Sequence, residues 1–480
     1  MARRSLYLAA PLLLAACTVG PNYQRPALTP TAGYGFSATP DGSPTLVAGA
    51  DVPAQWWQVF HSAELDALVA LALKHNSTIE AARAALQAAN EQTRAQRGAG
   101  YPQVTGSLEP TRQKFADTLA SPLSNNRELY SLTTTQLEVT YTPDLFGANR
   151  RAVESLQAQA DQQRFELEAA RLTLASNVVV AAIQDALLRA EMDETRGVID
   201  AQQRTLDSFR RQLRAGQAST ADVAGQEAAL AQAEAAFPPL QRAFQVNRDL
   251  LAALVGRTPG EPVEVRFDLA SLTLPDQLPL SLPAQLVEHR PDVRIAEAQL
   301  HSASAQIGVA KAARLPNIQL AATAGSAALA LTPAFGPETD FWSLAATLTA
   351  PIYDGGTLLH RQRAAEAAYR QAAAQYQGTV VGAFQNTADA LHAISADGDA
   401  VRMAEAANAA SRRSLEIARR QQAAGQGTAL AVLSAEAADH QARLAKVQAQ
   451  ASRDEDVAAL FQALGGGWWN TDATALAASR

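Results

Sequence analysis

The sequence has one cysteine, Cys17, in 480 residues, so no intrachain disulfide can form. Aromatic residues make up only 6% of the chain, a small share for a large compact globule. Alanine, glutamine, leucine, glutamate and arginine are abundant instead, a composition typical of long helices or coiled coils.

A basic excess is also absent. Asp and Glu number 47 against 40 Lys and Arg, and the net charge of −7 falls to −9 once Arg3 and Arg4 are removed with a targeting segment. Nucleic acid is therefore disfavoured as a partner, because phosphate binding requires a basic face. Beyond the N-terminus no apolar run reaches about 18 residues, so we expect no membrane-spanning helix.

The usual catalytic motifs are missing. The sequence contains no glycine-rich phosphate loop with lysine, no His-Glu-x-x-His and no Gly-x-Ser-x-Gly. His75 and His289 occupy equivalent helix positions, which suits packing or capping. The acidic run at residues 454–456 is expected to be a solvated helix face. We therefore expect no enzyme, no metal site and no cofactor other than a covalent lipid.

The chain contains one long repeat. Residues 289–318 match residues 75–104 at a constant offset of 214 positions, with Pro316 against Pro102. In each copy an Ala-rich helix stops just before the proline and gives way to a period-2 run. Solenoid units are only about 20–50 residues long, so the repeat predicts one body made of two halves.

The expected organisation follows from this repeat. It comprises a signal peptide (1–16), an acylated N-terminal strap (17–61), a first repeat (62–255), an equatorial linker (256–282), a second repeat (283–464) and a C-terminal tail (465–480).

The N-terminus has the features of a secretory signal. Arg3 and Arg4 are basic, residues 6–14 are apolar but too short to span a bilayer, and small residues precede Cys17. Leu14-Ala15-Ala16-Cys17 resembles the bacterial lipobox, which predicts lipidation of Cys17. The alternative is an ordinary signal peptide with an incidental cysteine. Two acyl chains would be needed for stable anchoring.

The strap is rich in proline and lacks periodicity, so we expect an extended tether. Trp56 and Trp57 lie at its C-terminal end. They either anchor the strap on the helical body, which we expect, or form a ligand-stacking pair.

Each repeat is expected to hold a helix, two strands and a long helical hairpin. In the first, Ser62 suits the N-cap of a helix reaching about Arg97. Alternating runs follow around Val104, Leu137, Ile318 and Trp342, each about ten residues long, enough to cross a bilayer as a strand. The smallest outer-membrane barrels have about eight strands, so a chain with four would have to oligomerise. Two soluble hairpins packed on the helices are the alternative.

Long helices come after each strand pair. Apolar residues recur every seven positions from Val153 to Leu188, which predicts a coiled-coil seam. The first helix is expected to reach Arg214, and the second to run from Gly356 to about Ala423. A glycine follows each of them, which suits a C-cap.

Several motifs together resemble the outer-membrane efflux protein family, the TolC-like, NodT-like lipoprotein channels of RND-type tripartite efflux pumps. These are the lipobox, the duplicated layout, Arg290-Pro291-Asp292-Val293, the run from Ile307 to Pro316, and Leu464-Gly465-Gly466-Gly467-Trp468. The resemblance covers nearly the whole mature chain.

This resemblance implies a mainly α homotrimer, with a 12-stranded β-barrel in the outer membrane continued by a 12-helix α-barrel in the periplasm. It implies passive conduction of small toxic compounds such as antibiotics. A periplasmic membrane-fusion adaptor would contact the tip, and an RND-type inner-membrane transporter would supply the energy.

The resemblance also assigns residues. It places adaptor contacts at Gly216, Gln217, Gly425 and Gln426, and periplasmic gate candidates at Asp222, Arg211, Arg214 and Arg420. Ala431 and Ser434 stand where some relatives have constricting carboxylates. Arg210 and Arg419 are further candidates for interhelix pairs, although such arginines can also simply complement helix dipoles. A type I protein-secretion duct and a non-conducting lipid-anchored scaffold remain alternatives, and the sequence does not identify the substrate.

Overall fold

The computed structural model describes residues 18–26, 45–114, 116, 118, 127–261, 263–275, 277–280, 287–329 and 339–470. Cys17 and the predicted signal peptide lie outside these ranges. The chain divides into two compact units. Unit 1 comprises Met1–Pro26, Leu86–Gln163 and Ala296–Tyr376, and unit 2 comprises Ala27–Ala85, Arg164–Ile295 and Gln377–Arg480.

Among the described residues, three pairs of helices have matching lengths in the two repeats. Helices α3 (Ser77–Gly98) and α7 (Pro291–Ala312) have 22 residues each, α4 (Ala148–Arg214) and α8 (Thr357–Ala423) have 67, and α5 (Thr220–Leu254) and α9 (Ala429–Ala463) have 35. One window of α4 is long and apolar enough to cross a bilayer, but 61% of it is buried inside the chain. The predicted seam of α4 faces the interior, since Ala160, Leu167 and Ala181 are all buried.

The prediction of a single helix from Ser62 to Arg97 is wrong at one point. Ser62 does cap α2 (Ala63–His75), but Asn76 separates this helix from α3. The Asn76 backbone is extended, its Nδ2 donates to the carbonyl of Leu254 at 3.0 Å, and its Oδ1 accepts from the backbone of Thr78 at 2.8 Å. The asparagine therefore ends α2 and caps α3. Because asparagine is a preferred N-cap residue, it stabilises a break between two helices at this position.

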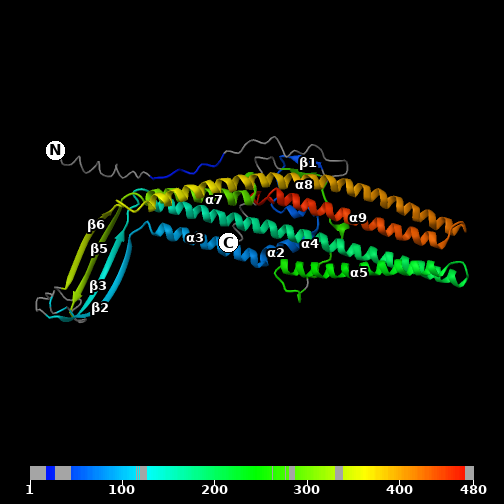
Figure 1. Cartoon of the computed structure of the whole chain (residues 1–480), viewed down its shortest axis with the longest axis horizontal. Coiled ribbons are helices and arrows are strands. Elements are labelled where there is room, and N and C mark those ends of the chain that lie inside the picture. Colours follow the sequence, from blue (N-terminus) through cyan, green and yellow to red (C-terminus); the bar gives the residue numbers. More distant parts are fainter. Residues whose placement is uncertain are drawn as a thin grey trace. The chain divides into compact units, whose positions relative to one another are not determined.

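In unit 1 the two predicted hairpins form one antiparallel sheet. Its strands are β2 (Gln103–Lys114), β3 (Leu129–Tyr141), β5 (Asn317–Ala328) and β6 (Asp340–Thr349), in the order β2-β3-β5-β6 (Figure 1). Pairing between β3 and β5 joins the repeats, with Leu137 opposite Ala324. Strands β2 and β6 are the two edges, and neither has a second strand partner among the described residues.

The N-terminal segment, residues 18–26, is held tightly on unit 1. The buried Arg151 donates to the carbonyl of Val19 at 3.3 Å and to Asn22 Oδ1 at 2.7 Å. A Cβ added to Gly20 would lie 2.5 Å from the Cα of Gly308, so the two backbones can approach only because both residues are glycine. The segment that follows Cys17 is thus fixed in place.

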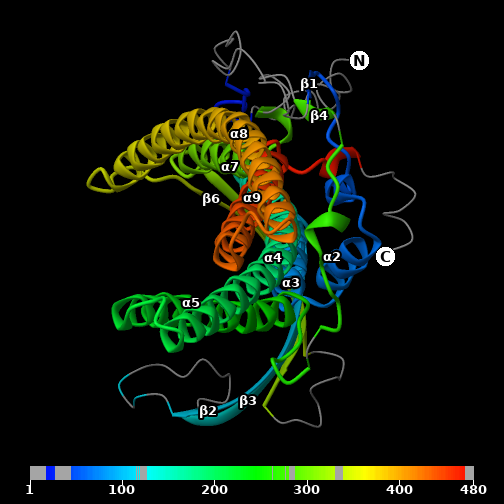
Figure 2. The ribbon, with the colours of Figure 1, turned by 90° about the vertical axis from the view of Figure 1, so that its right-hand side faces the viewer.

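In unit 2 the strap is anchored by aromatic packing, as predicted. Trp56 is 1% exposed and stacks on Phe461 of α9, with ring centroids 5.3 Å apart. Burial of such a side chain stabilises the fold by about 1.5–3 kcal/mol. The strap is not wholly irregular, however. Its strand β1 (Thr45–Ala48) pairs in parallel with β4 (Gln277–Leu280) of the linker region (Figure 2).

The Arg-Pro-Asp-Val motif has a structural role. Arg290 is 7% exposed, and its Nη1 donates to the carbonyl of Ala463 at 2.8 Å and of Ala383 at 3.4 Å. Its Nε and Nη2 donate to the two carboxylate oxygens of Asp292 at 3.0 and 2.7 Å. Pro291 is the first residue of α7, where a missing N–H costs nothing. One guanidinium thus ties the start of α7 to α8 and the end of α9.

We expect Arg290→Lys to lower the free energy of unfolding by about 2–3 kcal/mol, because an ammonium group cannot replace the planar fork of donors. Chemical denaturation of the detergent-solubilised protein measures this. The matched control is Arg266→Lys, at a residue with a side chain that is 69% exposed, which should change stability little. An equal loss in both variants would contradict the role assigned to Arg290.

Candidate functional site

The predicted tip consists of two loops, residues 215–219 between α4 and α5 and residues 424–428 between α8 and α9. We call them the hairpin loops. Gly216 and Gly425 have φ values of 72° and 73°, a left-handed conformation that glycine adopts readily. Gln217 N donates to the carbonyl of Gln212 at 2.8 Å, and Gln426 N to that of Gln421 at 2.9 Å. Both long helices therefore end in the same glycine C-cap.

The helices that leave the loops begin differently in the two repeats. Ser219 and Asp222 form a capping box at the start of α5, in which the Asp222 carboxylate accepts from the backbone and the hydroxyl of Ser219, both at 2.8 Å. These hydrogen bonds hold the pKa of Asp222 below its usual value. At the start of α9, Thr428 caps the helix and Ala431 takes the place of Asp222. Only the first repeat has this carboxylate.

An Arg–Glu pair across each hairpin is duplicated. Arg210 lies 2.8 Å from Glu227, and Arg419 lies 3.5 Å from Glu436, and in both cases the glutamate is 17 positions after the arginine. Arg204 of α4 also reaches Glu436, at 3.1 Å, and so links the two hairpins. These arginines are about half exposed, so each pair contributes only about 0.2–1 kcal/mol.

The structure brings together only part of the predicted gate. Arg211 lines a cavity of about 400 Å³ near the hairpin loops, together with Arg204, Arg419 and Glu436. Arg214 and Arg420 are exposed, and within the described part of the chain no ion pair joins them or Arg211 to a carboxylate. Sequence reasoning missed Glu227 and Glu436. The signal was available, because the Arg-to-Glu spacing of 17 recurs at matching positions of both repeats.

The expectation that residues 454–456 form a solvated helix face is wrong. Asp454 is 2% exposed and pairs with Arg453 at 3.0 Å, while Glu455 is hydrogen-bonded to Gln184 of α4. Burial raises the pKa of Asp454 to about 6. Burial and then the neighbouring Asp456 carboxyl raise the pKa of Asp397, on α8, to about 6 as well. We call Asp397, Asp454, Glu455 and Asp456 the acidic cluster.

The acidic cluster makes stability depend on pH. The folded-state pKa values of Asp397 and Asp454 lie above the unfolded ones, so proton binding favours the fold. This contribution is complete below about pH 4 and is lost as the pH rises through about 6.

Asp397→Asn should therefore raise the free energy of unfolding at pH 8 by about 1 kcal/mol, after allowance for solvent screening, and should weaken its pH dependence. Thermal unfolding between pH 4 and 8 measures both effects. Asp249→Asn, at an exposed position of α5, is the control. A profile that keeps its slope in Asp397→Asn would refute the interpretation.

Asp222→Ala should accelerate amide hydrogen exchange in the first turn of α5, because Ser219 loses its acceptor, while Asp222→Asn should do so much less. Thr428→Ala is the matched control, since it should loosen α9 and leave α5 unchanged. Single-channel recording of the same variants separates capping from gating. Asp222 acts as a gate residue only if both of its variants raise the resting conductance.

Comparison with known proteins gives consistent results over nearly the whole chain. A family described as outer membrane efflux protein matches residues 68–257 and 282–466. The outer membrane protein OprJ of Pseudomonas aeruginosa is 31% identical over 95% of this chain and 94% of its own length. The pyoverdine export outer membrane protein OpmQ of Pseudomonas putida is 29% identical over 92% and 94%. The solved structure of the outer-membrane channel OprN aligns with a TM-score of 0.83 at 26% identity, over 94% of this chain and all of that one.

Proposed function

Since this chain belongs to the outer membrane efflux protein family, we propose that three copies assemble into one conduit. Its function is that of an outer-membrane exit duct in a tripartite efflux pump. The sheets would close into a 12-stranded β-barrel, and the helices α4, α5, α8 and α9 of three copies would form a 12-helix tunnel.

The two faces of the sheet carry this proposal. Strand register places Gly106, Leu137, Ala324 and Trp342 in one row, and Val104, Val139, Ala322 and Leu344 in another row on the same face. Trp342 and Leu344 are 78% and 76% exposed. The row between them runs through Thr105, Glu138, Thr323 and Ser343 and points the other way. One apolar and one polar face are what a barrel between lipid and an aqueous lumen requires.

The free strand edges support the trimer. The edge backbones of β2 and β6 carry hydrogen-bonding groups that lipid cannot satisfy, so a sheet in a bilayer must close on itself. The four strands of the described sheet are too few to do so. Pairing of β6 with β2 of the next copy would remove every edge.

The remaining parts of the proposal concern the partners. A lipid on Cys17 would anchor the chain to the outer membrane. The exposed Gly216, Gln217, Gly425 and Gln426 would contact a periplasmic membrane-fusion adaptor, which connects to an RND-type inner-membrane transporter. Asp222, Arg211, Arg214 and Arg420 would act at the periplasmic gate. The compounds conducted would be small and toxic, and the transporter would select them.

Two measurements test the duct. The purified lipid-bearing protein should form heat-labile trimers in detergent and produce single-channel conductance in planar bilayers. Deletion of its gene should sensitise cells to small toxic compounds, with sensitivity restored by the wild-type gene. A monomeric protein without conductance, whose loss leaves the cells unaffected, would overturn the proposal.

A further inference from the structure

The turn between the second strand and the long helix is partly buried in the first repeat but fully exposed, or bare, in the second. In the first repeat, residues 143–147 join β3 to α4, and Pro143, Asp144, Leu145 and Phe146 are all partly buried. In the second repeat, residues 351–355 join β6 to α8 and are all exposed, with Ile352 at 93% and Tyr353 at 92%.

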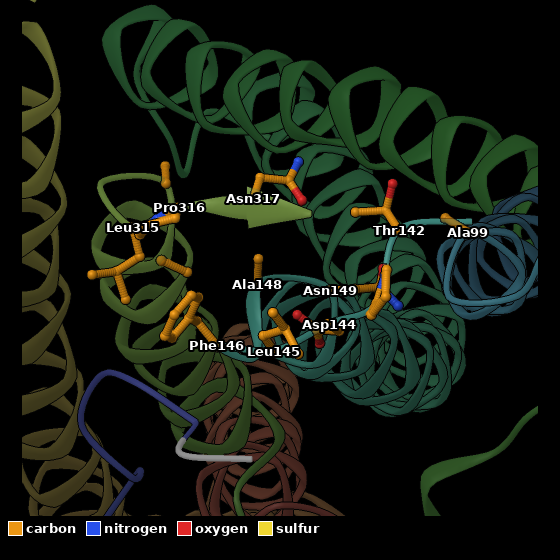
Figure 3. A pocket seen from close by; sticks show the side chains of 13 residues that line it. Ala99, Thr142, Asp144, Leu145, Phe146, Ala148, Asn149, Leu315, Pro316 and Asn317 are labelled. Atoms are coloured by element: carbon orange, nitrogen blue, oxygen red, sulfur yellow. The ribbon is translucent and has the colours of Figure 1, made fainter. Parts of the chain in front are cut away.

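The packed turn shows what such a segment contacts. Leu145 and Phe146 line a cavity of about 270 Å³ together with Leu315 and Pro316 from the turn between α7 and β5 (Figure 3). This contact joins the strand-to-helix turn of the first repeat to the helix-to-strand turn of the second. It follows from the pairing of β3 with β5, which brings the two turns to the same end of adjacent strands.

A matching surface for the bare turn is also present, and it is exposed at Tyr101 and Pro102. By the offset of the repeat, Tyr101 and Pro102 of the turn between α3 and β2 correspond to Leu315 and Pro316. Leu315 is partly buried, whereas Tyr101 is 69% exposed. Within this chain the turn at residues 351–355 follows the edge strand β6, and the turn at residues 98–102 precedes the opposite edge strand β2.

The adjoining helices show the same contrast. Ser155 of α4 lies 2.8 Å from Ser302 of α7, oxygen to oxygen, in a buried contact. The corresponding residues of α8 and α3 are Ala364 and Ala88, and both are exposed. Two alanines leave room for the helices to approach as closely as the serine pair does.

We propose that residues 351–355 of one copy dock on residues 98–102 of a second copy of this chain, with Ile352 and Tyr353 packing against Tyr101. The contact repeats between molecules the one that residues 143–147 make with residues 312–317 inside the molecule. Within the chain, the first-repeat turn and the second-repeat turn enclose one cavity. An equivalent cavity would form between two copies, each of which contributes one wall. This inference rests on the proposed trimeric duct and names the side chains that join its subunits.

The contact is heterologous, because two different surfaces meet, and a heterologous contact that closes makes a ring. The double variant Tyr101→Cys with Tyr353→Cys, treated with a short bis-maleimide, should therefore give covalent dimers and trimers and no larger species. Each single variant should give none. Tyr353→Cys with Leu129→Cys is the matched control pair, because Leu129 is exposed at the far end of β3 and should not cross-link.

The double substitution Ile352→Ser with Tyr353→Ser should raise the monomer share roughly tenfold at equal protein concentration, from the apolar area left unburied. Tyr353→Phe keeps the ring and should remain trimeric. If wild-type trimers conduct but the cysteine pair does not cross-link and the serine variant stays trimeric, the docking is wrong and the duct stands. A serine variant that stays trimeric but leaves the membrane would assign the turn to lipid, which also overturns the docking. Absence of wild-type trimers and conductance would refute the duct and the docking together.

Discussion

Backbone hydrogen bonding at the sheet edges is the constraint on which the rest of the molecule depends. A strand in lipid has no water to satisfy its donors and acceptors, so an open four-stranded sheet is stable there only when other strands complete it. The apolar row through Leu137 and Trp342 favours contact with lipid. The unpaired edges of β2 and β6 disfavour insertion of the sheet of a single molecule into lipid. Under the proposed function, oligomerisation would therefore be part of the folding of the membrane portion.

Much of this architecture could be predicted from the sequence because the same arrangement of helices and strands occurs in both repeats. Alternating runs identified all four strands of the described sheet, and the seven-residue spacing identified the long helices. The break at Asn76 was not predicted, because an asparagine inside a helical pattern indicates a cap only when its hydrogen-bond partner is known. That partner is the carbonyl of Leu254. The strand β1 was not predicted either, because its pairing partner β4 lies more than 200 residues later in the sequence.

The candidate site could be predicted less completely. The glycines of the hairpin loops stand out by composition, and their positive φ values agree with a C-cap. Burial of the charged residues 454–456 depends on three helices meeting, which no local pattern records. The capping box likewise gives Asp222 a structural task that the resemblance alone did not suggest. Charged side chains are therefore where sequence and structure differed most.

The matched lengths of the paired helices limit which insertions and deletions the two helical hairpins can accept. Helices of 67 and 35 residues occur in both hairpins, so the two hairpin loops fall at corresponding places in the repeats. An insertion of seven residues lengthens a helix by roughly 10 Å, and it keeps the seam in phase. If it occurred in one hairpin only, one loop would extend past the other. Relatives adapted to a wider or narrower periplasm should therefore gain or lose whole heptads in α4, α5, α8 and α9 together.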